Sequence, residues 1–416
     1  MPSSSVFQPI AANERIVTLD VLRGFALLGI LLMNIEAFVG PLNSVATGVD
    51  PQLEGLDRDV DALIYFFVQG KFYPLFSLLF GMGFALMAQR AVMAGRAFVP
   101  LYLRRSIVLL LIGGIHMCWI WAGDILMTYA LLALLLLPLY RWPPLRLACL
   151  GVLACLLIPV MLLALGSVIA QAQVDPAFAA RWDAQAMQYD DATAAILEAQ
   201  RQAYGYGSYA EATWQRMRDG WQSLSLLPMT APPIFGMFLL GAAFVKSGAI
   251  ANPERFSGLY RTLRWLVLPL GAALMAASFQ LAPSLGYLRI GWHVWTAIAL
   301  GILGGSAMCL GYFAWAAWII WKWPGKPWVK WLGSAGRMAL SNYLLQSIVC
   351  TMIFYGYGLG FFERLSRFWQ VPFVLLLFSI QVIVSHWWLR RFRFGPMEWL
   401  WRSLTYLKWQ PLRRSA

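Results

Sequence analysis

Residues 18–38 read TLDVLRGFALLGILLMNIEAF, an apolar run that contains the polar residues Asp20, Arg23 and Asn34. About twenty apolar residues in a helix suffice to cross a bilayer, so this run predicts a transmembrane helix. Asp20 and Arg23 are neighbours on such a helix, and Asn34 returns to the same face about 21 Å further along. The stripe therefore faces inward, either as a structural ion pair with Asn34 bonding a neighbouring helix or as one wall of a ligand cleft.

The composition of the 416-residue chain agrees with a membrane location. Apolar residues make up 60% and charged residues only 12%, which excludes a water-soluble globular enzyme. The formal charge of +13 could suggest nucleic-acid binding, but the apolar runs and 21 Trp favour lipid, so we expect a bilayer and no nucleic acid as partner. The five Cys form no CxxC pair, and the sequence predicts neither a disulfide framework nor a metal site.

We expect an all-α polytopic membrane protein with about ten transmembrane helices. An N-terminal half (1–170) and a C-terminal half (227–416) would hold five spans each, and residues 171–226 would form an extracytoplasmic helical loop. The expected spans are 16–38, 72–89, 102–121, 124–140, 145–170, 227–245, 262–282, 296–320, 336–356 and 371–389.

The distribution of Lys and Arg predicts the orientation, because cytoplasmic loops retain positive charge. With both termini inside, 22 of the 32 basic residues, Arg15 and Arg96 among them, lie in inner segments and nine lie outside. The loop 171–226 carries seven acids and four Arg, which fits the outer side. Its aromatic pattern predicts helices interrupted at Gly205 and Gly207, forming either a cap on the bundle or a substrate lid.

His116 lies inside the apolar run LLLIGGIHMCWIWAGDIL, residues 109–126, about 16 Å along the helix from Arg105. Gly113 and Gly114 permit close backbone approach beside it. Asp124 is eight residues away, about 12 Å on a straight helix, so a kink, a water or another helix must couple the two. His116 is either a hydrogen-bonded core group or a catalytic, proton-handling residue.

The C-terminal half contains GSAGRMALSNYLLQS, residues 333–347. On one continuous helix this string places Arg337 and Ser341 on one face and Asn342 and Gln346 on another. We expect a central helix, packed through Gly336 and Ser341, with Arg337 also available to contact an anion at the cytoplasmic mouth.

The tail string FGPMEWLWRSLTY, residues 394–406, spaces Glu398 and Arg402 as helical neighbours behind Pro396. Two Trp lie beside them. We expect an interfacial helix.

Five strings together resemble the YeiB-like bacterial membrane proteins, domain-of-unknown-function family 418. The match spans the chain in order and spacing, and it implies a multi-pass protein of the bacterial cytoplasmic (inner) membrane. The strings are LDVLRGFALLGILLMNI, KFYPLFSLLFGMGFAL, GGIHMCWIWAGDIL, GSAGRMALSNYLLQS and FGPMEWLWRSLTY.

The first string also resembles the transmembrane acyltransferases that include heparan-alpha-glucosaminide N-acetyltransferase, which deliver an acyl group from cytoplasmic acyl-CoA across the membrane. This resemblance implies that Asp20, Arg23 and Asn34 line the acyl-donor channel, with Asn34 near the reacting carbonyl. This chain has no His before His116, so the catalytic histidine would have to be His116.

The leading hypothesis is therefore an acyltransferase that uses acyl-CoA, acetyl-CoA in the first instance, and a hydroxyl or amine acceptor. His116 would act as general base, with Asp124 orienting or charging the site and Asn34 polarising the thioester carbonyl.

A basic mouth would hold the CoA phosphates. Beside Asp20 and Arg23, its expected residues are Arg104, Arg105, Arg337, Ser341 and Asn342.

Two other readings fit the same residues. In a proton-coupled transporter or exporter, Asp20, Arg23 and His116 would form a relay without bond chemistry. In a structural membrane protein, the aromatic outer loop would bind another protein, and a homo-oligomer is one such arrangement.

Overall fold

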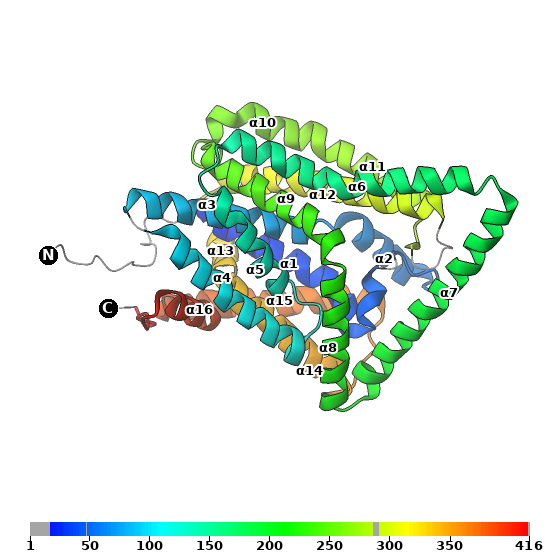
Figure 1. Ribbon diagram of the computed structural model, residues 1–416. Helices are drawn as coiled ribbons and strands as arrows, with labels where there is room; N and C mark the ends of the chain where they lie inside the picture. Colours follow the sequence, from blue (N-terminus) through cyan, green and yellow to red (C-terminus); the bar gives the residue numbers. More distant parts are fainter. Residues whose placement is uncertain (1–16, 47, 96, 286–290, 415–416) are drawn as a thin grey trace.

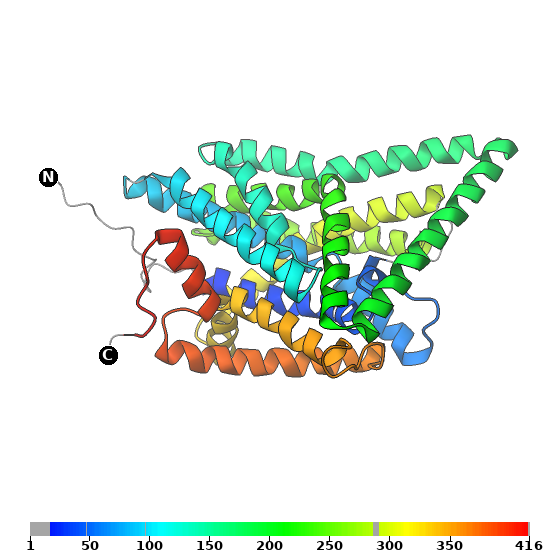
Figure 2. The same ribbon diagram turned by 60° about the horizontal axis from the view of Figure 1, so that its bottom comes forward.

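The computed structural model describes residues 17–46, 48–95, 97–285 and 291–414, and its regular elements there are all helical (Figures 1 and 2). The expected all-α polytopic fold is confirmed. Arg15 and Arg96, which entered the charge count, lie outside the described residues.

Eight helical segments in those ranges are long and apolar enough to cross a membrane. They are α1 (Val17–Val39), α2 with α3 (Gly55–Phe67 and Phe72–Met93), α4 with its π-helical end (Phe98–Ile115 and His116–Ile120), α6 (Pro144–Ala172), α9 (Leu227–Lys246), the segment Pro253–Leu281 with α10 (Ser257–Thr262) and α11 (Leu268–Leu281), α12 (Trp292–Lys322) and α15 (Arg367–Arg391).

The expectation of ten full spans needs correction at two places. The expected span 124–140 is α5 (Leu126–Leu136) with a 3-10 turn to Leu139, about 21 Å long, and the expected span 336–356 contains only α14 (Ala339–Phe354), about 24 Å long. The hydrocarbon core is about 30 Å thick, so neither helix crosses it alone. Both begin where the preceding chain breaks its helix inside the bundle.

The second break lies at Met338, whose φ of −110° and ψ of 29° separate α14 from α13 (Pro327–Arg337). Gly336 lies just before it and packs on α1, where any side chain would collide with the Asp20 carbonyl. The expected packing role of Gly336 is confirmed. Its lack of a side chain lets α13 lie directly against the polar end of α1.

Helix starts follow local chemistry. Proline is the first residue of four α-helices, where its missing N–H has no partner to lose. They are α6, α7 (Pro176–Gln200), α13 and α16 (Pro396–Tyr406). Ser208 and Glu211 form a reciprocal capping box that opens α8 (Tyr209–Ser225).

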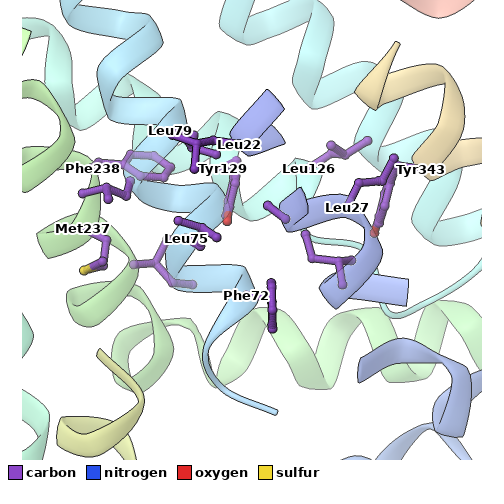
Figure 3. Packing of buried hydrophobic residues seen from close by; sticks show 14 of the residues in the cluster. Leu22, Leu27, Phe72, Leu75, Leu79, Leu126, Tyr129, Met237, Phe238 and Tyr343 are labelled. Atoms are coloured by element: carbon purple, nitrogen blue, oxygen red, sulfur yellow. The ribbon is translucent and has the colours of Figure 1, made fainter. Parts of the chain in front are cut away.

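The two halves of the chain share one core. α9 packs between α3 and α6, while α1 contacts α13, α14 and α15. Figure 3 shows part of this core, in which Tyr129 of α5 meets Phe238 of α9 at 5.1 Å between ring centroids. The described parts of the two halves therefore interleave in space.

The acidic connections and the basic tail lie at opposite ends of the bundle. In Figures 1 and 2, α2, α7 and α8 lie at or toward one end and α16 lies at the other. The loop 171–226 contains α7, a π-helical turn at Arg201–Tyr206 and α8, so the predicted helices and their interruption at Gly205 and Gly207 are confirmed.

The charge distribution predicts that α7 faces outward and the tail inward. In a variant without the exposed Cys149 and half-buried Cys118, a cysteine at the exposed position of Gln185 should react with an impermeant maleimide in intact cells. A cysteine at Arg414 should react only after permeabilisation. The reverse labelling pattern would show that the orientation is wrong.

Candidate functional site

The candidate site lies where α4 ends. After Ile115 the helix widens into the π-helical turn His116–Ile120, closed by a 2.8 Å hydrogen bond from Trp121 N to the His116 carbonyl. Trp121 is extended, with φ of −158° and ψ of 127°, and the chain reverses before α5. Non-helical backbone at membrane depth is tolerated only inside the protein or along a cavity, so this reversal marks a position of interest.

The reversal brings His116 and Asp124 into direct contact. His116 Nδ1 lies 2.7 Å from Asp124 Oδ2, and both side chains are 0% exposed. Asp124 Oδ1 accepts a 2.7 Å hydrogen bond from Met127 N and so caps the start of α5. The change in backbone direction therefore brings His116 and Asp124 together directly, without another helix between them.

Gly113 makes the contact sterically possible. A Cβ atom there would lie 2.5 Å from Met127 N and 3.0 Å from the Leu126 carbonyl carbon, both backbone atoms of the opposing α5. Gly114 faces open space instead. The predicted close approach therefore depends on Gly113 alone.

Two aromatic rings flank the imidazole, and a third packs behind one of them. The ring of Tyr343 lies 5.2 Å and that of Trp121 lies 6.4 Å from the His116 ring, and Phe38 of α1 packs on Trp121 at 4.2 Å. Tyr343 belongs to α14, so the two short helices meet at this histidine. Asn34, half-buried, lies one turn before Phe38 on α1, which places it on the helix face that leads toward the site.

The hydrogen bond to Asp124 determines what His116 can do. A carboxylate only accepts hydrogen bonds, so Nδ1 donates to Asp124, and in a neutral imidazole Nε2 then carries the lone pair. Nε2 is buried and has no hydrogen-bond partner among the described residues. This is the arrangement of a base that is oriented on one nitrogen and available on the other.

A basic cluster lies at the end of the bundle occupied by α16. Arg23 forms the expected ion pair with Asp20 at 3.0 Å. The guanidinium of Arg105 stacks on Trp401 of α16, 3.5 Å from the ring centroid. The positive charges of Arg402 and Arg23 lie close enough to repel the charge of Arg105. We call Arg23, Arg105 and Arg402 the inner arginine cluster.

The other two expected arginines donate to backbone carbonyls. Arg104 Nε donates to the Pro100 carbonyl at 3.3 Å, and Arg337 donates to the Arg393 carbonyl at 3.3 Å. They lie at the same end of the bundle as the cluster, the end occupied by α16.

The expected pairing of Arg337 with Ser341 on one helix face is wrong, because the chain breaks at Met338 between them. Ser341 instead donates to Glu398 at 2.5 Å, and Glu398 also accepts from Leu340 N and Ser341 N, at 2.7 and 3.0 Å. Burial raises the pKa of Glu398, and these hydrogen bonds oppose that rise. The tail helix therefore caps α14, which joins two motifs into one unit.

Asn342 forms part of a buried network between α14 and α15. Its amide donates to Ser385 at 2.9 Å and to the Ala335 carbonyl at 3.2 Å, while Gln346 bonds Gln381 at 2.9 Å. Both amide donors of Asn342 are used within the protein, so its geometry fits helix association better than a cofactor contact.

Sequence reasoning missed a buried ion cluster and a buried arginine toward the end of the bundle opposite α16. Arg367 lies 3.0 Å from Glu36 and 2.7 Å from Asp61, although the sequence placed it in an outer loop. Glu36 is an ionisable residue inside the first span, a signal that could have revealed the cluster. Arg216 of α8 carried no comparable signal, because an arginine in a polar loop is ordinary.

Comparisons with known proteins show the following. The family model described as "Protein of unknown function (DUF418)" matches residues 244–408. The chain is 36% identical to the uncharacterized protein YxaH of Bacillus subtilis (strain 168), over 99% of each chain. It is 34% identical to the uncharacterized protein YeiB of Escherichia coli (strain K12), over 94% of this chain and 96% of that protein. No solved structure matches.

Replacing Gly113 by Ala should destabilise the protein by about 1–3 kcal/mol, because two backbone atoms of α5 would have to move. Gly114→Ala is the matched control and should be neutral or stabilise the helix by up to about 1 kcal/mol. Thermal unfolding in detergent measures both. Equal melting temperatures for the two variants would contradict the close packing of α5 on Gly113.

Proposed function

The chain belongs to the DUF418 family, and we propose that it is a membrane-embedded acyltransferase of the bacterial cytoplasmic membrane. It would take an acyl group, acetyl in the first instance, from cytoplasmic acyl-CoA and transfer it to a hydroxyl or amine acceptor on the extracytoplasmic side. The observation that carries the proposal is the buried His116–Asp124 pair with its unpartnered Nε2.

The reaction would proceed by general base catalysis. His116 Nε2 removes the proton from the acceptor O–H or N–H as the acceptor oxygen or nitrogen attacks the thioester carbonyl carbon. The C–S bond then breaks, and the CoA thiolate leaves with the proton returned from the imidazolium. Asp124 stabilises the imidazolium through Nδ1, and Asn34 would donate to the carbonyl oxygen that becomes negative.

The donor would enter at the inner arginine cluster. Its three guanidinium groups and the Trp401 ring offer charge and a stacking surface for a phosphorylated nucleotide. Arg105 and His116 are eleven residues apart on one helix, so the thioester would lie about 16 Å from the phosphates. Arg104 and Arg337 flank the same end.

A proton-coupled transporter is the second candidate, favoured by a different observation. Arg367, Glu36 and Asp61 are ionisable groups buried together, and Lys71 is 1% exposed and donates to the Tyr65 carbonyl and the Met275 sulfur. Such groups are typical of ion pathways in membranes. Purified protein with labelled acetyl-CoA separates the two functions, because only an enzyme hydrolyses or transfers the label.

CoA should raise the melting temperature of the wild-type protein, with about 2.7 kcal/mol of stabilisation at a concentration 100 times its Kd. Arg105→Gln and Arg402→Gln should reduce the shift, because each removes a charge from the inner arginine cluster. Lys326→Gln, an exposed cation elsewhere, should retain it. The proposed donor site would be excluded by the absence of any shift at millimolar CoA.

His116→Gln should lower kcat by about two orders of magnitude or more and leave CoA binding intact, because a general base acts on the transition state. Asp124→Asn should also lower kcat, since the amide can still cap Met127 N but no longer fixes the same imidazole tautomer. His293→Gln serves as control. If His116→Gln turns over within about threefold of wild type, His116 is a packing residue.

A further inference from the structure

The most unusual charge outside the donor site is Arg216 on α8, whose side chain is 0% exposed. Its guanidinium donates to Tyr357 Oη at 2.7 Å, to Thr213 at 3.2 Å and to the Trp119 carbonyl at 3.3 Å. All three partners are neutral. Arg216 Nε is buried without a hydrogen-bond partner among the described residues.

Three tyrosine rings enclose this guanidinium. Its central carbon lies 5.3 Å from the ring centroids of Tyr209 and Tyr357 and 5.7 Å from that of Tyr355. We call these three residues the tyrosine box. Ring faces attract a cation, but they do not neutralise it.

No carboxylate in the described part of the chain forms an ion pair with Arg216. The acid nearest along α8 is Asp219, which accepts from Tyr204 Oη at 2.5 Å and from Gln215 at 2.9 Å. Burial raises the pKa of Asp219, and the hydrogen bonds from Tyr204 and Gln215 oppose that rise. A buried charge without an ion-pair partner is costly, and an incoming anion would reduce that cost.

Arg216 also lies beside the end of α4. The Trp119 carbonyl that it contacts belongs to the π-helical turn that begins at His116, and Tyr209 donates to the same carbonyl at 2.7 Å. Gly220, one turn further along α8, packs against Met117. Figures 1 and 2 both show α8 passing the end of α4. The charge is therefore held at the outer side of the His116–Asp124 pair.

We propose that Arg216 and the tyrosine box bind an oxyanion carried by the acceptor, a phosphate ester or a carboxylate. This inference rests on the proposed function and names the acceptor class. The guanidinium offers Nε beside its terminal nitrogens, a fork that matches two oxygens of one oxyanion. Tyr209 is 47% exposed, so an acceptor would reach the guanidinium past this side chain.

The test uses the full-length protein and requires no acyl transfer. Thermal unfolding is followed with sodium phosphate, glycerol 3-phosphate or sodium acetate, against sodium chloride at equal ionic strength. Wild type should be stabilised by at least one of the oxyanions, and Arg216→Gln should raise the apparent Kd about tenfold or more, the effect of losing a charge-assisted contact.

Arg218→Gln is the matched control, because Arg218 lies two residues away on α8 and its guanidinium stacks on the exposed Trp214. It should bind the oxyanion as wild type does. Arg216→Lys keeps the charge but not the fork and should be intermediate, which separates anion binding from a general folding defect. If no oxyanion stabilises the wild type, or if the stabilisation is equal in Arg216→Gln and Arg218→Gln, the proposed site is wrong.

The source of the oxyanion is tested in nanodiscs. Arg216-dependent stabilisation by phosphatidylglycerol over phosphatidylcholine indicates a lipid headgroup, and stabilisation by glycerol 3-phosphate or acetate indicates a soluble acceptor. Arg216-dependent binding without any transfer of label from acetyl-CoA would support the site and overturn the acyltransferase function. The two failures are therefore distinguishable.

Discussion

The hydrogen bond between His116 and Asp124 closes a backbone reversal inside an apolar bundle, and the candidate site depends on it. Lipid cannot form hydrogen bonds with free backbone N–H and C=O groups. A helix can therefore end at membrane depth only where protein groups or a water-filled cavity supply those hydrogen bonds. Here the Asp124 carboxylate accepts a hydrogen bond from Met127 N, and Tyr209 and Arg216 of α8 donate hydrogen bonds to the Trp119 carbonyl. The groups that complete the reversal are the same groups that would carry chemistry.

The bundle has two interrupted helices, and their relation explains its organisation. α5 begins at the reversal after His116, and α14 begins at the break after Arg337. Tyr343 of α14 contacts the imidazole, while Glu398 of the tail helix holds the first turn of α14. The tail is thereby linked through α14 to the histidine at the end of α4.

The polar groups also divide along the bundle axis. The inner arginine cluster lies beside the tail helix, the His116–Asp124 pair lies further along α4, and Arg216 of α8 lies beyond that pair. A transferase that takes a donor from one side of a membrane and an acceptor from the other needs this order. A transporter would need a continuous path of ionisable groups, for which the Arg367 cluster is the stronger support.

The sequence by itself determined the membrane environment, the positions of the apolar helices and the unusual place of His116 within one of them, because hydrophobicity and the cost of a buried polar group act within short segments. It could also predict that Gly113 allows a close approach. Only the tertiary structure decided that the chain reverses after Trp121, that Arg337 and Ser341 belong to different helices, and that Arg216 is buried. Those outcomes depend on contacts between residues far apart in the chain, such as Ser341 with Glu398 and Arg216 with Trp119, which no local pattern encodes.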